Sequence, residues 1–392
     1  MGQIKYLKDA DITNKRVLLR VDYNVSMDEH HKISNDTRIT QSLPTINHMI
    51  KNNKIIIISH LNRPKKRDSE HSLAPVVEWI KTYLPDTKIT LVNDFLTEDK
   101  SVFENQKNGE IIMLENIRFY PEEQACDPEF AKKLAELGDV YVNDAFGVDH
   151  HPAASLTVID QYLPSYAGLL LEKEVKLIGG AIENPQKPFV AILGGAKVSD
   201  KIKLISRLIE IADQVLLGGG IANPFLAAAG FPIGKSICEQ DMIETARSLI
   251  EHAANTNTDL VFPIDVTVGD LNSDEGGEVV KITDVPPDKA ILDIGSETEA
   301  NFGAIIAHAK TIVWNGPVGV FENPEYRQGT DFIYYSIVRN PNAISIIGGG
   351  DTLAAIARKV YIEKITHIST GGGAMLELIE KGTLPGIEAL KQ

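Results

Sequence analysis

One unit recurs along this chain: a short apolar run, then a polar or glycine-rich turn, then a stretch with helical periodicity. Continuous apolar runs bounded by turns are typical of strands buried on both faces, and intervening helices indicate parallel βαβ connections. The sequence therefore predicts an α/β fold with two open, doubly wound, Rossmann-like parallel sheets. The runs are 16–21, 54–59, 110–114 and 139–142 in the first half, and 188–193, 213–217, 311–314, 343–347 and 366–368 in the second.

A chain of 392 residues is long enough for two or three domains. The segment between the two sets of strands predicts a helix that ends at Gly179-Gly180 and is followed by a proline-bearing stretch. We expect residues 1–170 to form one domain, 171–184 an interdomain helix and hinge, and 185–382 a second domain.

The composition excludes several kinds of partner. The formal net charge of −15 argues against nucleic acid or an anionic membrane surface. Cys126 and Cys238 match no metal or redox spacing and are expected to be reduced thiols. The amino terminus lacks the apolar core of a signal peptide, and no apolar run is long enough to span a bilayer. We expect a cytoplasmic protein whose partners are small molecules.

In the first half, charged and amide side chains follow the predicted strands. Ligands of open parallel sheets bind beyond the carboxyl ends of the strands, so these side chains are expected to converge. The guanidinium fork suits carboxylate and phosphate oxygens, which predicts an anion-binding cleft. The alternative is that these arginines lie on the surface in salt bridges. That alternative could explain any one arginine, but it explains their repeated placement after strands less well. The residues are Asp22, Tyr23, Asn24, Arg38, His60, Leu61, Asn62, Arg63 and Arg118.

In the second half, the predicted strands end in glycine. Without a β-carbon, glycine lets backbone N–H groups approach phosphate oxygens at the start of the next helix. Five such loops at one sheet edge predict a nucleotide site, although a single loop would serve any tight turn. No loop reads G-x-G-x-x-G, and 230–236 is one residue short of a P-loop, so we interpret it as a turn. The loop residues include Gly194, Gly195, Gly218, Gly219, Asn315, Pro317, Gly349, Gly350, Asp351, Thr352, Gly371 and Gly372.

Three polar side chains add to this nucleotide site. Lys197 and Lys201 are predicted to lie one helical turn apart and to place two cations near phosphates. Asp351 could hold Mg²⁺, which favours a carboxylate together with phosphate oxygens. Phosphoryl transfer needs positioning and charge neutralisation more than a nucleophilic side chain, so these residues suffice. We interpret 149–151 (Asp-His-His) as a solvated loop rather than a metal site.

At these positions the chain resembles the phosphoglycerate kinase family. The motifs occur in the family's order over nearly the whole length: VDYNV, NDTRI, SHLNRP, LENIRF, VNDAFG, LGGAKVSDKI, LLGGGIAN, VWNGPVGVFE, GGGDT and HISTGGGA. The resemblance implies the phosphoglycerate kinase fold and reversible, Mg²⁺-dependent transfer between 1,3-bisphosphoglycerate with ADP and 3-phosphoglycerate with ATP. It also implies a monomer, closure of the two domains, and a tail (383–392) that returns to the first domain.

The resemblance also implies roles for individual residues. Arg38, Lys197, Gly371 and Gly372 would act on the transferred phosphoryl group. Asp22, Asn24, His60, Arg63 and Arg118 would bind phosphoglycerate together with Arg38. Lys201, Gly295, Asn315, Glu322 and the 349–352 loop would bind the nucleotide, with Asp351 at the metal.

The chain departs from the family pattern at several of these motifs. His151 replaces an arginine that usually holds the substrate phosphate, and a neutral imidazole is a weaker phosphate partner. Asn62 stands for a usual glycine, Pro224 for a threonine and Met375 for a serine. Pro224 would be harmless if it lay in the first turn of a helix. Two other readings stay open: a non-catalytic nucleotide-binding relative with an impaired phosphoglycerate site, and a nicotinamide-dependent dehydrogenase.

Overall fold

The computed structural model describes residues 3–271, 276–356 and 360–391. The chain forms two compact units, one running to Lys176 and including the residues from Thr383 onward, the other Leu177–Gly382. Each unit contains one six-stranded sheet in which every strand pair is parallel. The predicted fold class, two parallel-sheet α/β domains, is therefore confirmed.

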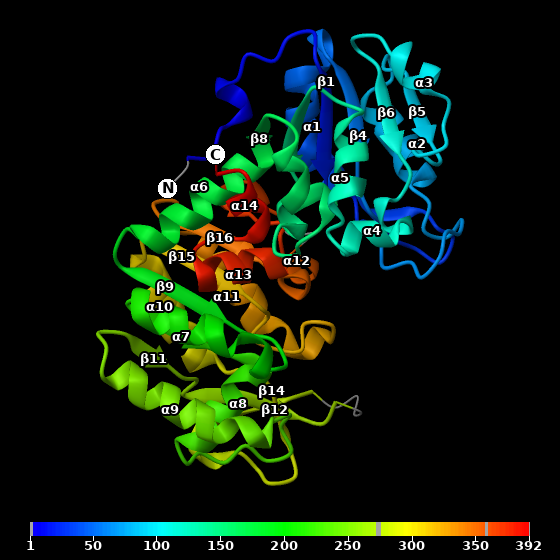
Figure 1. The fold of residues 1–392 in the computed structure, drawn as a ribbon. Coiled ribbons are helices and arrows are strands. Elements are labelled where there is room, and N and C mark those ends of the chain that lie inside the picture. Colours follow the sequence, from blue (N-terminus) through cyan, green and yellow to red (C-terminus); the bar gives the residue numbers. More distant parts are fainter. Residues whose placement is uncertain (1–2, 272–275, 357–359, 392) are drawn as a thin grey trace. The chain divides into compact units, whose positions relative to one another are not determined.

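The sheet of unit 1 has the strand order β5-β6-β4-β1-β7-β8 (Figure 1). The chain leaves β1 toward one edge and later returns to β1 on its other side through β7, so the strand order reverses beside β1. Such a reversal is where ligands bind in open α/β sheets. The strands are β1 (Arg16–Val21), β4 (Lys54–Ile58), β5 (Ile89–Val92), β6 (Ile111–Leu114), β7 (Val140–Asp144) and β8 (Ser165–Ala167).

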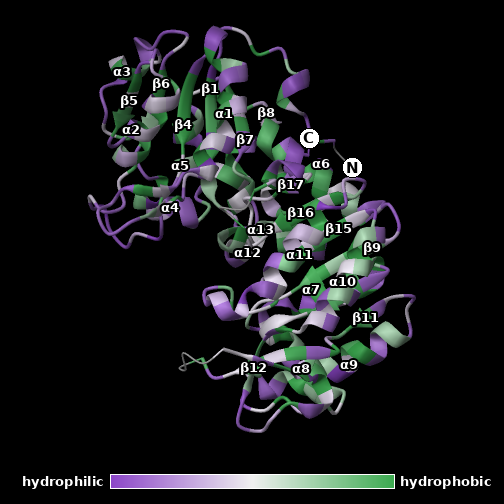
Figure 2. Cartoon of the chain, turned by 180° about the vertical axis from the view of Figure 1, so that it is seen from behind, coloured by the Kyte–Doolittle hydropathy of each residue, from purple (hydrophilic) through white to green (hydrophobic). Residues whose placement is uncertain are grey.

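Helices on both sides of this sheet bury its apolar strands. Val17, Leu18 and Leu19 in β1 have no exposed surface, and the strands of both units stand out as hydrophobic in Figure 2. The α-helices are α1 (Thr37–Met49), α2 (Ala74–Tyr83), α3 (Lys100–Glu104), α4 (Pro121–Gln124), α5 (Pro128–Ala135) and α14 (Pro385–Ala389). Short helical turns are η1 (Leu7–Asp9), η2 (Ile50–Asn52), η3 (Ile117–Phe119), η4 (Phe146–Val148), η5 (Ala154–Val158) and η6 (Ile159–Gln161).

The carboxyl-terminal segment packs on unit 1. The backbone N–H of Gly386 donates to the carbonyl of Asp149 at 2.9 Å, and Ile4 forms an antiparallel bridge with Lys391. The two chain ends therefore lie close together, as Figure 1 shows.

The sheet of unit 2 has the order β11-β10-β9-β15-β16-β17, and its strand order reverses between β9 and β15. The strands are β9 (Phe189–Leu193), β10 (Gln214–Leu217), β11 (Asp259–Val261), β15 (Thr311–Asn315), β16 (Ile344–Gly348) and β17 (His367–Ile368). The helices are α7 (Ile202–Ile211), α8 (Gly219–Ala228), α9 (Ile243–Ala254), α10 (Ser296–His308), α11 (Gln328–Val338), α12 (Gly350–Ile356) and α13 (Gly373–Lys381), with the turns η7 (Ser199–Lys201), η8 (Gln240–Met242), η9 (Ile282–Asp284), η10 (Pro324–Tyr326) and η11 (Ile362–Lys364).

Two antiparallel sheets were not predicted. Unit 2 contains β12 (Asp265–Gly269) between β13 (Glu278–Lys281) and β14 (Ala290–Ile294), and unit 1 contains the pair β2 (Ser26–Met27) and β3 (Ile33–Asn35). These strands carry polar residues between their apolar ones, so a search for continuous apolar runs passes over them.

One local prediction about a helix is wrong, and the condition stated for Pro224 is not met. Helix α6 (Leu169–Glu183) continues through Gly179-Gly180 instead of ending there. Neither glycine has a positive φ, and buried Ile178, Ala181 and Ile182 flank the pair. Pro224 lies inside α8, beyond its first turn. By contrast, 230–236 forms a turn as predicted, with Ser236 N–H donating to the Ile233 carbonyl at 3.0 Å.

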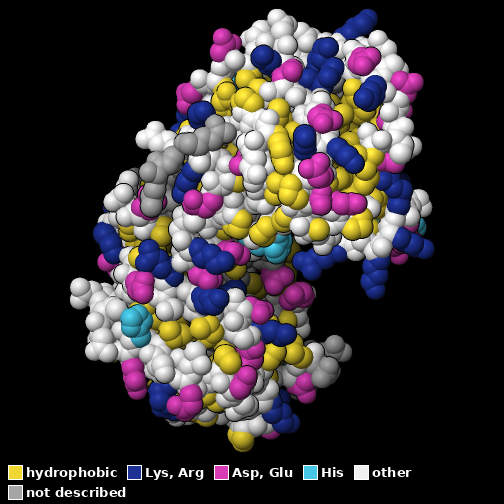
Figure 3. All heavy atoms as spheres, viewed as in Figure 1, with side chains coloured by type: hydrophobic (Ala, Val, Ile, Leu, Met, Phe, Trp, Pro, Cys, Tyr) yellow, Lys and Arg dark blue, Asp and Glu magenta, His cyan; other side chains and the backbone are white. Residues whose placement is uncertain are grey.

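The surface carries both signs of charge. On the face shown in Figure 3, cationic and anionic side chains are interspersed over both units. Within the described ranges, no helix is both long and apolar enough to cross a membrane.

Candidate active site

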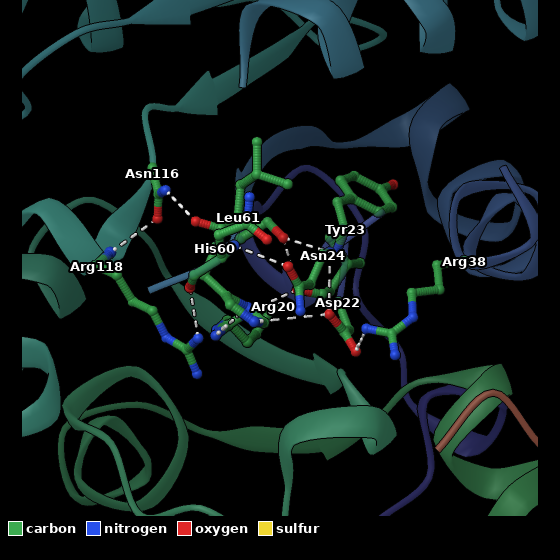
Figure 4. Close-up of polar contacts among 12 residues, drawn as sticks. Arg20, Asp22, Tyr23, Asn24, Arg38, His60, Leu61, Asn116 and Arg118 are labelled. Atoms are coloured by element: carbon green, nitrogen blue, oxygen red, sulfur yellow. Dashed lines mark hydrogen bonds and ion pairs between the residues drawn. The ribbon is translucent and has the colours of Figure 1, made fainter. Parts of the chain in front are cut away.

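The turn after β1 and the start of α1 meet at an ion pair. The Arg38 guanidinium donates to Asp22 Oδ2, and Asp22 Oδ1 accepts the Asn24 N–H at 3.1 Å (Figure 4). Arg38 is still partly exposed, with 29% of its side-chain surface accessible. Asp22 therefore fixes the arginine while leaving part of its fork available to a ligand.

His60 lies at the centre of this cluster and is almost fully buried. Its Nε2 is 3.9 Å from Asp22 Oδ1, and its Nδ1 is 3.5 Å from Arg20 Nη2. Burial and the positive charges of Arg20, Arg118 and Arg38 lower the pKa of His60 well below its usual value. The imidazole is therefore neutral near pH 7 and offers one donor and one acceptor.

The loop after β4 joins these residues to η3. Asn62 adopts a left-handed conformation with φ of 56°, which accounts for a position where the resembling family has glycine. Its N–H donates to Asn24 Oδ1 at 2.8 Å, and its carbonyl accepts from Arg118 Nη1 at 2.7 Å. Burial, with Arg20 and Arg63 nearby, lowers the pKa of Arg118 to about 10, so it remains cationic.

A cavity of about 330 Å³ opens beside these groups. Three guanidinium groups and one imidazole line it, together with a single carboxylate, which makes it suited to an anion. The polar lining residues are Arg20, Arg63, Arg118, His151, Glu123 and Gln124. The predicted convergence of Arg63, Arg118 and His151 is therefore found. Asp22, which holds Arg38, is linked to Arg118 by hydrogen bonds through Asn24 and Asn62.

Arg20 was not among the predicted site residues. It lies inside the apolar run of β1 and is 2% exposed. Its Nε donates to Ser155 Oγ at 2.9 Å, and Ser155 Oγ in turn donates to Glu123 Oε1 at 2.6 Å. A charged residue within a run that predicts burial on both faces was the available signal, because buried charge requires partners.

Tyr23 and Leu61 do not present side chains to the cavity. Both are fully buried, and Figure 4 shows them pointing away from the Arg118 guanidinium. Tyr23 OH lies 2.8 Å from Ser42 Oγ, and the Leu61 carbonyl accepts from Asn116 Nδ2 at 2.8 Å. Only their backbone atoms could meet a ligand.

The interpretation of 149–151 as a solvated loop is wrong for Asp149. This carboxyl group is completely buried, accepts from Asn143 Nδ2 at 2.9 Å, and sits against Gly386 of the carboxyl-terminal segment. Burial raises its pKa to about 6. His150 and His151 stack with ring centroids 3.8 Å apart, and His151 is exposed.

In unit 2, the glycine loops after β9 and β15 meet where the strand order reverses. A β-carbon at Gly194 or Gly316 would overlap the backbone of the other loop, so both positions require glycine. Lys201 Nζ donates to the carbonyls of Gly194, at 2.7 Å, and Asn315, at 3.3 Å. Burial lowers the pKa of Lys201 to about 8, although the negative charge of Asp351 opposes this.

Two cavities border these loops. The first, of about 440 Å³, has mostly apolar walls with a few acidic groups; its lining includes Gly195, Gly219, Asn223, Leu226, Asp293, Pro317, Val318, Glu322 and Asp351. The second, of about 270 Å³, is lined by Asp200, Lys201, Asn315, Gly316, Gly349, Gly350, Asp351, Thr352, Gly372, Gly373 and Leu376. Asp351 borders both cavities, which indicates one extended site with an apolar end and a glycine-lined end.

Some predicted nucleotide residues lie outside both cavities. Lys197 is exposed on the loop before η7, so the prediction that it lies one helical turn from Lys201 is wrong. Gly194, Gly218, Gly295 and Gly371 do not line either cavity; the first three pack against Pro317, Val318 and Asp265 respectively. Met375 is buried, and its sulfur packs against Gly348 at the end of β16.

Among the described residues, no group of three or more His, Cys, Asp or Glu side chains could hold a metal ion. Asp351 is exposed at the second position of α12, beside Gly349 and Thr352. It could bind a cation only with oxygen ligands from a second molecule.

A two-domain α/β protein with a cationic cavity in one unit and a glycine-lined cavity in the other belongs to the class built to bind two small ligands, at least one anionic. A family model described as phosphoglycerate kinase matches residues 7–382. The phosphoglycerate kinase of Chloroflexus aggregans is 44% identical, covering 99% of this chain and 98% of the relative, and that of Dictyoglomus turgidum is 45% identical, covering 98% of each. The chain belongs to the phosphoglycerate kinase family.

Solved structures agree with this assignment. Phosphoglycerate kinase from Coxiella burnetii matches with a TM-score of 0.90 at 41% identity, covering 99% of this chain and 98% of that one. The Pyrococcus horikoshii enzyme matches with a TM-score of 0.85 at 32% identity and the same coverage.

Proposed function

We propose that this protein is a phosphotransferase that moves a phosphoryl group reversibly between the acyl phosphate of 1,3-bisphosphoglycerate and ADP, as a step of glycolysis. The products are 3-phosphoglycerate, whose carboxylate is the acceptor in the reverse direction, and ATP. The observation that carries the proposal is that unit 1 has a cationic cavity and unit 2 has a glycine-lined cavity. Family membership supports the same reaction.

In unit 1, the substrate phosphate would bind the guanidinium groups that line the cavity, Arg63 and Arg118, with His151 in reach of the same space. The neutral His60 would donate a hydrogen bond to the glycerate, because its lowered pKa leaves it uncharged. Arg38, held by Asp22, keeps exposed N–H groups for the carboxylate and the transferring phosphoryl. Asn24 and Asn62 hold the loop in place through their mutual hydrogen bond.

In unit 2, the nucleotide base would occupy the apolar cavity and its phosphates the glycine-lined one. The N-termini of α12 and α13 border the second cavity and favour negative charge there. Glu322, in the first cavity, suits ribose hydroxyls. Lys201 and the exposed Lys197 would neutralise charge on the phosphates during transfer, as Arg38 does from the acceptor side.

Mg²⁺ fits this site through Asp351. Mg²⁺ is usually held by one or two carboxylates together with substrate phosphates, and Asp351 supplies one exposed carboxylate at the glycine-lined cavity. When bound, the ion would supply positive charge that offsets the negative charge of the phosphates.

Transfer requires the acceptor carboxylate and the terminal phosphate to come into contact, and water must be excluded to prevent hydrolysis. We therefore propose closure of residues 1–170 and 185–382 about 171–184 during turnover. We also propose that the protein acts as a cytoplasmic monomer with no nucleic-acid or membrane partner.

A coupled assay tests this function. ATP- and 3-phosphoglycerate-dependent formation of 1,3-bisphosphoglycerate, followed through NADH consumption by a coupling dehydrogenase, is the expected result. Arg38→Ala should remove this activity while leaving ATP binding by calorimetry unchanged. ATP binding without turnover in the wild-type protein would instead favour a non-catalytic relative, and NAD binding in a thermal-shift titration would favour a dehydrogenase.

A further inference from the structure

Asp293 is a buried carboxylate in the wall of the apolar cavity of unit 2. It lies in β14, is 3% exposed, and belongs to the lining of the 440 Å³ cavity. Neither the sequence motifs nor the comparisons assign it a role. A buried carboxylate is stable only where donors satisfy both of its oxygens, so its partners identify what it holds in place.

Those partners are two backbone N–H groups. Asp293 Oδ2 accepts from Gly329 at 2.8 Å, and Oδ1 accepts from Ile294 at 2.9 Å. Gly329 is the second residue of α11, where backbone N–H groups lack partners within the helix. The carboxylate therefore caps α11 from a neighbouring strand, at the end of the helix that favours negative charge.

The same carboxylate touches the loop between β15 and η10. A β-carbon on Gly319 would overlap Asp293 Oδ1, and so would one on Gly329. Asp293 is thus enclosed between this loop and the start of α11. Neither Gly319 nor Gly329 has room for a side chain.

The loop at 317–322 forms part of the cavity and touches both neighbouring glycine loops. Its members Pro317, Val318 and Glu322 line the cavity. The carbonyl of Pro317 accepts from Gly195 N–H at 2.8 Å, and that of Val318 accepts from Gly219 N–H at 3.0 Å. A shift of this loop would therefore displace the glycine loops as well.

We propose that Asp293 is a positioning residue for nucleotide binding: its carboxylate fixes the 317–322 loop against α11 and thereby sets the affinity for ATP. This inference rests on the proposed function in one respect, because it takes the cavity to be the nucleotide site. It adds a residue that does not touch the reacting atoms and acts only through the loop.

The charges around Asp293 make its interaction with the 317–322 loop and α11 sensitive to pH. Burial raises the pKa of Asp293 to about 7, and Glu299 on α10 and Asp331 on α11 add to the rise. Arg327, just before α11, pairs with Asp331 at 3.3 Å, and Asp265 on β12 is engaged by Thr298 N–H at 2.7 Å. Protonation of Asp293 below about pH 7 would weaken its charge-assisted bonds to both N–H groups.

The decisive variant is Asp293→Asn, which keeps the shape but places an amide N–H₂ against one backbone N–H. We expect the KM for ATP to rise about tenfold, with the KM for 3-phosphoglycerate unchanged. Asp213→Asn is the matched control: Asp213 also accepts a backbone N–H, from Phe189 at 2.6 Å, but at the amino end of β9. Gly319→Ala keeps Asp293, displaces the loop, and should cause the same selective rise.

Measuring ATP affinity as a function of pH distinguishes a positioning role of Asp293 from a general structural role. In the wild type and in Asp213→Asn, ATP affinity should fall between about pH 8 and pH 6 by more than in Asp293→Asn, where no carboxyl titrates at this position. Calorimetric binding of ATP measures this without turnover, so an inactive protein would count against the proposed function and not against this inference. Equal effects of Asp293→Asn and Asp213→Asn, equal rises in both KM values, or an unaltered pH profile would each overturn it.

Discussion

The ammonium group of Lys201 donates a hydrogen bond of 2.7 Å to the carbonyl oxygen of Gly194, at the point where the strand order of unit 2 reverses. The side chain thus occupies the junction of the β9 and β15 loops rather than solvent. Since the cavity it borders is also lined by the glycine-rich start of α12, the lysine lies at the proposed phosphate site.

This burial predicts a pH dependence of nucleotide capture. Burial lowers the pKa of Lys201 to about 8, so the free enzyme loses this positive charge as pH rises through that value. We expect kcat/KM for ATP to fall above about pH 8, because this parameter reports the free enzyme. Lys201→Arg, which stays charged, should shift the fall to higher pH, and an identical fall in Lys201→Arg would show that another group is responsible.

The same shift predicts a change in stability. The folded-state pKa of Lys201 lies below its unfolded value, so the unfolded chain binds more protons between about pH 8 and pH 10. The free energy of unfolding should therefore rise with pH across this interval in the wild type. Lys201→Met should lack this contribution to the rise, as measured by urea unfolding at each pH, and parallel curves for the two proteins would contradict the assignment.

His151 marks the clearest departure from the family pattern, and it lines the cationic cavity. His151→Arg adds a permanent charge and a bidentate donor beside Arg63 and Arg118. We expect the KM for 3-phosphoglycerate to fall about fivefold, with the KM for ATP unchanged. His30→Arg, at a side chain that is 73% exposed, is the control for added charge alone. An unchanged or higher KM in His151→Arg would show that the histidine loses nothing in binding.

Arg20 supports the cavity from within the sheet, and its removal should destabilise unit 1. Burial raises the pKa of Glu123, and the positive charge of Arg20 opposes that rise. Arg20→Leu would remove the positive charge that offsets much of the cost of burying the Glu123 carboxylate, although the Ser155 hydrogen bonds remain. We expect the free energy of unfolding to fall by about 3 kcal/mol. Urea unfolding followed by tryptophan fluorescence measures this loss, because Trp79 lies in unit 1.

The direction in which the stability defect of Arg20→Leu changes with pH provides the control. Because the folded-state pKa of Glu123 lies above the unfolded value, stability is lost as pH rises through it, and the loss grows when Arg20 is absent. The defect of Arg20→Leu should therefore shrink as pH is lowered, and Glu123→Gln should restore part of it at neutral pH. Additive effects of the two substitutions would exclude coupling between these residues.

The sequence predicted the central strands of both parallel sheets, such as β1, β4, β9 and β15, because each is an apolar run buried on both faces. Short strands such as β8 (SYA) and the antiparallel β14 (AILDI) escaped, since they are brief or interrupted by a charge. That interruption is Asp293, and the charge within β1 is Arg20. A search for continuous apolar runs identifies strands but gives no role to a charged residue within one. The partners of these two side chains come from distant segments that only the tertiary fold brings together.

Contacts at the loops show the same limit. The segment at 149–151 was expected in solvent, yet the carboxyl-terminal segment covers Asp149, an arrangement that no local pattern encodes. Lys197 and Lys201 were spaced for one helix, but α7 begins only after Lys201, and the two lysines have different environments. A spacing of four residues places two side chains on one helical face only if both residues lie within the same helix.

Asn62 permits a test of how the loop after β4 holds the cationic cavity. Its φ of 56° lies in the left-handed region, which asparagine tolerates better than alanine does and which glycine adopts freely. Asn62→Ala should lower the free energy of unfolding by about 1 kcal/mol, whereas Asn62→Gly should change it little. Strain at alanine would shift the backbone carbonyl of residue 62 that accepts from Arg118, so the alanine variant should also raise the KM for 3-phosphoglycerate while leaving ATP binding intact. Urea unfolding of both variants, with steady-state kinetics, measures the two effects. Equal stability of the alanine and glycine variants would show that the left-handed backbone at this position carries no strain.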